Sequence, residues 1–168
     1  MRPSPTVTLE RARSLANEAV FTVALQCRRL RTNEPEDDTF VFRWWADLQF
    51  LIVALRRLRR AAQIAAGVPG TAVAVKSAIH TFDEALPGLD KMRNIGEHID
   101  EYAVDSHRRR DRSVTRQHLQ VGTWDGTTYT WLDCELNIDT ALVAAENLFL
   151  ATRTAAKTCA PRPPESAS

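Results

Sequence analysis

The side chains best suited to acid–base chemistry lie together in the middle of the chain, between Leu89 and Asp105. The residues that carry such groups are Arg93, Asn94, Glu97, His98, Asp100, Glu101 and Tyr102. Cleavage of RNA without a metal ion needs a base for the 2′-hydroxyl proton, an acid for the leaving oxygen and a cation for the developing negative charge. A histidine that titrates near neutrality can act as the base or the acid, and an arginine can hold the phosphate.

A short motif lies inside this stretch, Arg93-Asn94-Ile95-Gly96-Glu97-His98. It resembles the Arg-x4–6-His signature of the HEPN superfamily, whose members commonly carry Asn or Asp directly after the arginine. The resemblance covers this hexapeptide and a compatible all-helical frame. It implies a helical domain that dimerises so that two copies of the motif face each other. It also implies a metal-independent endoribonuclease of the toxin or defence type, although other members only bind nucleic acid or nucleotides.

In this interpretation His98 is the acid–base group, Arg93 stabilises the phosphate and Asn94 orients His98. The residues expected to support them or to contact nucleic acid are Tyr102, Arg57, Arg60, Arg109 and Arg110. On one continuous helix Arg93 and His98 lie about 140° apart, whereas Asn94 and His98 lie about 40° apart. One chain therefore cannot easily close Arg93 and His98 on a single phosphate, and a two-fold dimer is expected to bring both residue types together.

A purely structural interpretation of the same residues is also open. Arg93 can form a salt bridge with Glu97 one helical turn later, and His98 can be a surface histidine among polar neighbours. Gly96 is harder to explain within an isolated helix, because a glycine in a helix interior costs about 1 kcal/mol relative to alanine. It predicts a close contact of this helix with another element.

Apolar residues at helical spacing predict five helices, over about residues 8–31, 39–66, 71–86, 89–105 and 139–157. Thr8 is the expected N-cap of the first helix, and Asn137 or Asp139 that of the last. Around Asp125-Gly126, a pair that type I′ turns prefer, β-branched and aromatic residues predict two strands, about 117–124 and 127–133. The predicted fold is mainly α: an up-and-down bundle of about five helices with one β-hairpin before the last helix. It forms a single domain over residues 1–159, followed by a disordered tail over 160–168.

The helix expected over residues 39–66 is apolar on nearly all sides in its first half. This pattern is typical of a central helix or of one that faces a partner subunit. Asp47 lies within that half and needs a partner if it is buried. The second half carries the arginines Arg56, Arg57, Arg59 and Arg60, which suit either a phosphate backbone or a solvated flank. The alternative function is therefore a non-catalytic helical module that binds protein or nucleic acid.

Other kinds of site are disfavoured. No histidine has a glutamate three positions before it, as di-iron bundles require, and neither a zinc motif nor a glycine-rich phosphate loop occurs. We therefore expect no metal and no cofactor. The three cysteines, Cys27, Cys134 and Cys159, form no CxxC pair, which favours reduced thiols. His80 is expected to pair with Glu84 one turn later.

The composition is that of an ordinary globular protein. Of the 168 residues, 44% are hydrophobic and 26% are charged, and the net charge of +1 gives no overall field for a nucleic acid or membrane partner. The most apolar run, residues 50–55, is too short to span a bilayer. The sequence predicts a cytoplasmic protein without membrane association. The resemblance to the HEPN superfamily implies a homodimer and makes RNA and an antitoxin or another protein its candidate partners.

Overall fold

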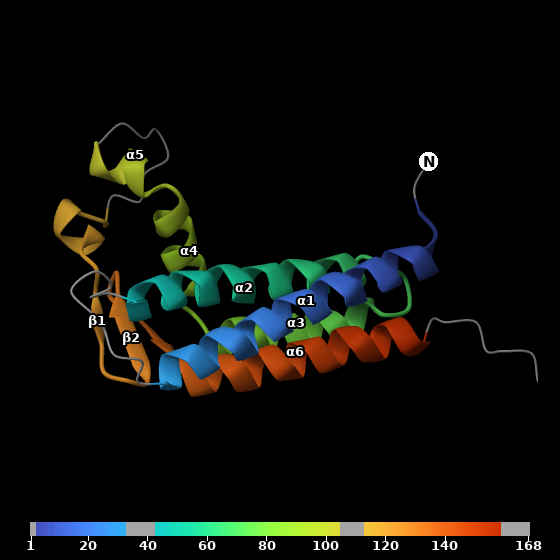
Figure 1. The fold of residues 1–168 in the computed structure, drawn as a ribbon. Helices are drawn as coiled ribbons and strands as arrows, with labels where there is room; N and C mark the ends of the chain where they lie inside the picture. Colours follow the sequence, from blue (N-terminus) through green and yellow to red (C-terminus); the bar gives the residue numbers. More distant parts are fainter. Residues whose placement is uncertain (1–2, 33–42, 105–112, 159–168) are drawn as a thin grey trace, which may run out of the picture.

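The computed structural model describes residues 3–32, 43–104 and 113–158. Four long helices run alternately up and down to form a bundle (Figure 1): α1 (Pro5–Arg31), α2 (Arg43–Ala66), α3 (Ala72–Ala85) and α6 (Ile138–Thr158). The short helices α4 (Leu89–Glu97) and α5 (Ile99–Ala103) and a small sheet lie at one end of the bundle. The prediction of a mainly helical fold with a β-element before the last helix is confirmed. The expected helix start at 39–42, Arg109, Arg110, Cys159 and the tail over 160–168 lie outside the described residues.

The core follows the stripes that the sequence predicts. α1 packs against α2 and α6, and α6 also packs against α2 and α3. The buried positions of α1 recur every three or four residues and are mostly small: Leu9, Ala12, Ala16, Ala19, Val23, Cys27 and Leu30. Leucines of α2 fill the centre of the bundle: Leu48, Leu51, Leu55 and Leu58. Asp47 is buried beside them and accepts a hydrogen bond from Arg29 Nε of α1 at 2.8 Å, which supplies the partner that a buried carboxylate requires.

The first helix begins earlier than the sequence predicts. Its N-cap is Ser4, whose hydroxyl accepts a hydrogen bond from the backbone N–H of Val7 at 3.3 Å. Pro5 follows at the first helical position, where the missing N–H leaves no donor unsatisfied. Thr8 donates its hydroxyl to the Ser4 carbonyl oxygen at 3.0 Å instead. The prediction of Thr8 as N-cap is wrong because Pro5 already fits the start of the helix.

The stretch from residue 89 to residue 105 is not one helix. α4 ends at Glu97, His98 adopts φ −117° and ψ 26°, and α5 begins at Ile99. Gly96, which has a low helix propensity, lies two residues before the break. Ile99 is 37% exposed, because the break takes it out of the apolar stripe of α4. The angle of about 140° between Arg93 and His98 therefore does not apply, since it assumes a continuous helix.

A three-stranded antiparallel sheet precedes α6, in the order β1 (Thr123–Trp124), β2 (Thr128–Trp131) and β3 (Cys134–Asn137). The predicted turn at Asp125-Gly126 connects β1 and β2. The first strand is shorter than predicted, because Arg116–Leu119 forms a short 3₁₀ helix, η1. The sequence does not predict β3, since its turn is made by Leu132 and Asp133. Both adopt φ 58° without the glycine or asparagine that such turns usually contain.

The sheet is attached to the helices by two side chains. Tyr129 of β2 is fully buried, and its ring packs edge-on against Trp44 of α2 with the centroids 6.2 Å apart. Asn137 ends β3 and caps α6, because its side-chain oxygen accepts hydrogen bonds from the N–H groups of Asp139 and Thr140 at 3.1 and 3.0 Å. Of the two predicted caps of α6, the structure confirms Asn137.

Candidate functional site

The candidate site lies where α4 packs on α2, near the sheet end of the bundle (Figure 1). Asp90, in the first turn of α4, forms an ion pair with Arg56 of α2. Further along α4, a β-carbon on Gly96 would lie 3.2 Å from Gln49 Oε1 of α2 and 3.7 Å from Trp131 Cη2 of β2. The predicted close contact at Gly96 is confirmed, and it involves both a helix and a strand.

Arg93 lies on α4 between these two contacts and is directed along its own helix. Its side chain is only 16% exposed. Nη1 donates to Asn94 Oδ1 at 2.9 Å, and Nη2 forms an ion pair with Glu97. The salt bridge between Arg93 and Glu97, which the purely structural interpretation predicts, is therefore present. An anion that binds Arg93 has to compete with the Glu97 carboxylate.

His98 occupies the break between α4 and α5, and its side chain is 48% exposed. Its Nδ1 lies 3.2 Å from Glu101 Oε1 of α5. A proton on Nδ1 that is donated to this carboxylate fixes the ring and makes Nε2 the basic nitrogen. The structure thus pairs His98 with Glu101, and Asn94 with Arg93. Tyr102, the next residue of α5, is buried.

Several guanidinium groups lie around Arg56, which pairs with Asp90 of α4. The pKa of Arg56 is lowered, mainly by burial; the charge of Asp90 opposes this shift, and the positive charges of Arg59, Arg60 and Arg93 add to it. Charges that act on one another in this way share one small region of the molecule. We call Arg56, Arg59, Arg60 and Arg93 the arginine cluster.

Part of the arginine cluster is neutralised within the chain. Arg59 donates from Nε and Nη2 to the two carboxylate oxygens of Asp83 in α3, each at 2.6 Å, and these hydrogen bonds raise the pKa of Arg59. Arg56 has Asp90 and Arg93 has Glu97 as ion-pair partners. The net positive charge that the cluster presents is therefore smaller than its four arginines suggest.

The other predicted residues are distributed over different surfaces. Arg57 and Arg60 both line a groove between α1 and α2, although Arg60 also belongs to the arginine cluster. Arg109 and Arg110 are outside the described residues. Arg60 therefore lies near Arg56 as well as in the groove, and Arg57 lies in the groove beside α1.

The sequence does not indicate which side of α2 receives α4. Gln49 and Arg56 are seven positions apart, about two helical turns, so both lie on one side of α2. Polar residues at that spacing indicate that another element of the fold packs beside them. They do not indicate which element docks, because the contact with Asp90 and Gly96 is formed only in the tertiary structure.

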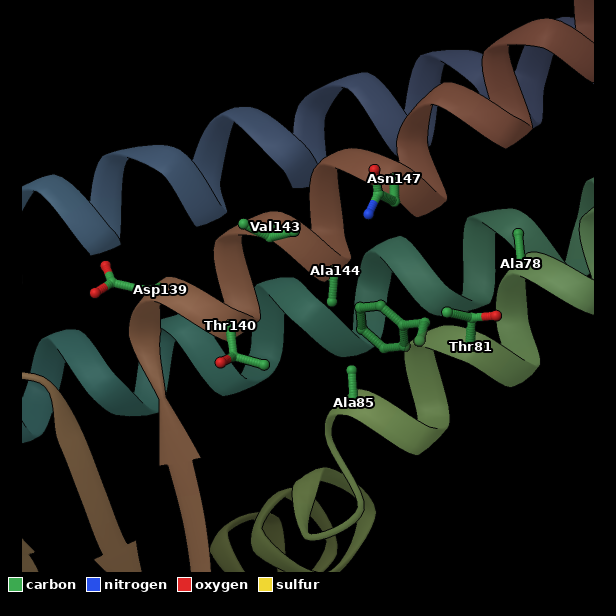
Figure 2. Close-up of a pocket in the computed structure, with 9 residues that line it drawn as sticks. Ala78, Thr81, Ala85, Asp139, Thr140, Val143, Ala144 and Asn147 are labelled. Atoms are coloured by element: carbon green, nitrogen blue, oxygen red, sulfur yellow. The ribbon is translucent and has the colours of Figure 1, made fainter.

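A second hollow, about 670 Å³ in volume, lies between α3 and α6 (Figure 2). Phe82 forms its buried base, and small alanine and threonine side chains from both helices line its sides. Among the described residues that line it, Asp139 alone is charged, and it pairs with Arg31 of α1. This hollow is therefore mostly apolar, and the carboxylate in its lining is held in an ion pair with Arg31.

The remaining candidate groups are inert or paired. Burial raises the pKa of the Cys27 thiol to about 11, so Cys27 is not a thiolate nucleophile at neutral pH. His80 Nε2 lies 3.5 Å from Glu84 Oε1, as predicted. Within the described residues no three His, Cys, Asp or Glu side chains converge on a metal site. None of the described helices is long and apolar enough to cross a membrane.

Comparisons of the chain with protein-family models, curated proteins and solved structures found no significant match.

Proposed function

We propose that the protein is a HEPN-like, metal-independent endoribonuclease that acts as a homodimer. The observation that carries the proposal is the position of the Arg93-Asn94-x3-His98 motif. Its arginine joins the arginine cluster, and its histidine lies at a helix break beside the Glu101 carboxylate. Guanidinium groups suit a phosphate, and a half-exposed histidine suits proton transfer. By resemblance to the HEPN superfamily, the proposal includes a toxin or defence role, with an antitoxin or another protein as the controlling partner.

In the proposed reaction His98 Nε2 takes the proton of a ribose 2′-hydroxyl, and the 2′-oxygen attacks the adjacent phosphorus. Arg93 donates hydrogen bonds to the non-bridging phosphate oxygens and stabilises the charge of the phosphorane. The bond between phosphorus and the 5′-oxygen then breaks, which leaves a 2′,3′-cyclic phosphate on one fragment. The departing 5′-oxygen takes a proton from a histidinium.

A second copy of the chain supplies the second histidine that the reaction needs. One imidazole cannot be unprotonated as the base and protonated as the acid at the same moment. Two copies of His98 around one phosphate provide both forms, and two copies of Arg93 double the positive charge there. Homodimerisation is for this reason part of the proposal.

The test is cleavage of single-stranded RNA by the purified protein in EDTA. We expect fragments that end in 2′,3′-cyclic phosphate. We also expect a loss of about 100-fold or more in His98→Ala and in Arg93→Ala, which is the usual size of an acid–base contribution. His80→Ala is the matched control, because His80 is an exposed histidine that pairs with Glu84 on α3. Undiminished cleavage by both site variants would refute the assignment.

Binding of nucleic acid without cleavage is the second candidate. It is favoured by Arg57 and Arg60, for which the described part of the chain offers no carboxylate partner. This candidate predicts RNA affinity that falls steeply as salt is raised, because bound phosphates release counterions. It also predicts that His98→Ala leaves the affinity unchanged, with no cleavage by the wild-type protein. Electrophoretic mobility shifts at two salt concentrations measure both points.

A further inference from the structure

A polar pocket with a volume of about 560 Å³ lies between η1 and the end of β2. Side chains that can form hydrogen bonds line most of it: Gln117, His118, Gln120, Thr123, Thr130 and Asp133. Among the described residues that line it, Asp133 carries the one carboxylate, and none is an arginine or a lysine. A pocket of this composition suits a neutral group that donates hydrogen bonds better than it suits a phosphate.

The Asp133 carboxylate is held in place by its turn and by His118. Leu132 and Asp133 both adopt φ 58°, a conformation that a leucine rarely takes, and the Leu132 side chain is buried. The backbone N–H of Thr115 donates to His118 Nδ1 at 2.9 Å, so the neutral ring carries its proton on Nε2. That Nε2 lies 3.6 Å from Asp133 Oδ2, and the Asp133 side chain is 75% exposed. The carboxylate is therefore fixed in position and accessible to a ligand.

Two amide side chains complement the carboxylate. Gln117 of η1 and Gln120, which follows η1, line the same pocket, and both are exposed. An amide N–H donates to a carbonyl oxygen, whereas the Asp133 carboxylate accepts two N–H groups. Of the four RNA bases, guanine alone carries a carbonyl oxygen beside two adjacent N–H donors on its Watson–Crick edge. Adenine and cytosine place the lone pair of a ring nitrogen beside the carboxylate, and uracil places a carbonyl oxygen on each side of its one N–H. The pocket therefore favours guanine.

The pocket shares its walls with the α2–α4 site. Trp131 lines the pocket, and its Cη2 lies 3.7 Å from the position of a β-carbon on Gly96. Leu132 also lines the pocket, and its carbonyl oxygen accepts a hydrogen bond from Lys91 Nζ of α4 at 2.8 Å. The helix that follows His98, α5, packs against η1. A nucleotide whose base enters the pocket therefore lies close to the motif.

We infer that this pocket binds a guanine base of an RNA strand. The Asp133 carboxylate accepts hydrogen bonds from N1–H and from the 2-amino group of guanine, and the amide of Gln117 or Gln120 donates to the guanine O6. The inference names the base preference of the proposed ribonuclease. It rests on that function for the position of the guanine near the cleaved bond, and on the pocket alone for the binding of guanine.

The first test is calorimetric titration of the full-length protein with 5′-GMP, 5′-IMP and 5′-AMP. These nucleotides carry the same phosphate, so the differences in affinity between them report on the base. The nucleotide 5′-IMP lacks the 2-amino group and should bind about fivefold more weakly than 5′-GMP, because one donor to the carboxylate is missing. Both donors are missing in 5′-AMP, which should bind at least ~20-fold more weakly. Equal affinity for the three nucleotides, or no binding of 5′-GMP at ~1 mM, would overturn the inference.

Asp133→Asn removes the carboxylate with the least change to the turn, because asparagine adopts positive φ readily. It should lower the affinity for 5′-GMP at least ~10-fold and leave that for 5′-AMP unchanged. Glu135→Gln is the matched control, since Glu135 is an exposed carboxylate of β3 outside the pocket; it should bind 5′-GMP as the wild type does. An Asp133→Asn protein that folds as the wild type does and keeps the preference for 5′-GMP would overturn the inference.

Binding of short RNA distinguishes an RNA strand from a free nucleotide. In a His98→Ala background, which prevents the proposed cleavage, the labelled RNA pentamer AAGAA should bind at least ~10-fold more tightly than AAAAA. Asp133→Asn should remove this difference. A preference for 5′-GMP without a preference for the guanine-containing RNA would overturn the assignment to RNA. Guanine preference in a wild type that cleaves no RNA would refute the proposed reaction and leave the pocket standing, whereas cleavage without any guanine preference would do the opposite.

Discussion

Alanine substitution of two glycines in the sheet region distinguishes the effect of backbone strain from that of steric contact. Gly122, just before β1, has φ 80°, and a β-carbon there would lie 2.6 Å from the Thr130 carbonyl oxygen and 2.9 Å from the Tyr129 ring. Gly126, in the turn between β1 and β2, has φ 102°, and a β-carbon there would meet nothing within 4 Å. Gly126→Ala therefore adds strain alone, whereas Gly122→Ala adds strain and a collision.

The expected losses in the free energy of unfolding follow from these two terms. A left-handed backbone costs a non-glycine residue about 1–2 kcal/mol, and the reduced freedom of the unfolded chain returns about 0.4–1 kcal/mol. Gly126→Ala should therefore destabilise the protein by about 1 kcal/mol. Overpacking adds about 1–3 kcal/mol at Gly122, because the carbonyl oxygen of Thr130 belongs to the backbone of β2 and cannot rotate away. Gly122→Ala should lose about 2–4 kcal/mol.

Urea unfolding followed by far-ultraviolet circular dichroism measures both variants against the wild type, provided the transition is two-state. The midpoint for Gly122→Ala should fall two to four times as far as that for Gly126→Ala, in the ratio of the energies above. Equal losses for the two variants would refute the steric reasoning. A neutral Gly122→Ala variant would refute the placement of Gly122 against β2.

Two further predictions concern single carboxylates. Glu97→Gln releases Arg93 from its ion pair and, for the proposed site, should tighten RNA binding about fivefold, the equivalent of about 1 kcal/mol. Fluorescence anisotropy with a labelled RNA measures the affinity in a His98→Ala background, with Glu84→Gln as the control. An unchanged affinity for Glu97→Gln would contradict the prediction. The Asp125 carboxylate accepts hydrogen bonds from the N–H groups of Thr128 and Thr127 at 2.7 and 2.8 Å and from the Thr127 hydroxyl, which lower the pKa of Asp125. The folded state thus binds the proton of the Asp125 carboxyl more weakly than the unfolded state does. The stabilisation is therefore present above the unfolded pKa and is lost as pH falls through the folded pKa. The difference between the urea midpoints of the wild type and Asp125→Asn should narrow from pH 7 to pH 3, and a constant difference would contradict the prediction.

The sequence predicts the long helices well because their signals are local. The stripe on α1 and the cap at Asn137 depend on residues within a few positions of one another. The same local signals are ambiguous at the start of α1, where Thr8 is a good cap but Ser4 with Pro5 is better. They fail at β3, because Leu132 and Asp133 reach positive φ through their tertiary surroundings. One such contact is the hydrogen bond from Lys91 Nζ of α4 to the Leu132 carbonyl oxygen at 2.8 Å.

The candidate site is predictable only in part for the same reason. The motif at Arg93 and His98 is visible in the sequence, and Gly96 correctly indicates a close contact. The break at His98 is not visible, because no proline marks it and a single glycine such as Gly96 is tolerated inside a helical pattern. The approach of Arg56 to Arg93 joins α2 to α4 across the fold, and only the packed structure brings these two charges together.

The junction between β3 and α6 contains no connecting residue. Asn137 is the last residue of the strand and Ile138 the first of the helix, and the N–H of Ile138 donates to the Thr127 carbonyl oxygen at 3.0 Å. The Asn137 side chain caps α6 through its oxygen and donates from Nδ2 to the Thr128 hydroxyl at 3.1 Å. Separation of β2 from β3 therefore also frees the N–H of Ile138, the first residue of α6, and the amide of its cap Asn137. The sheet and the bundle should open as a single cooperative unit, so the amide protons of β3 and of the first turn of α6 should exchange with solvent together.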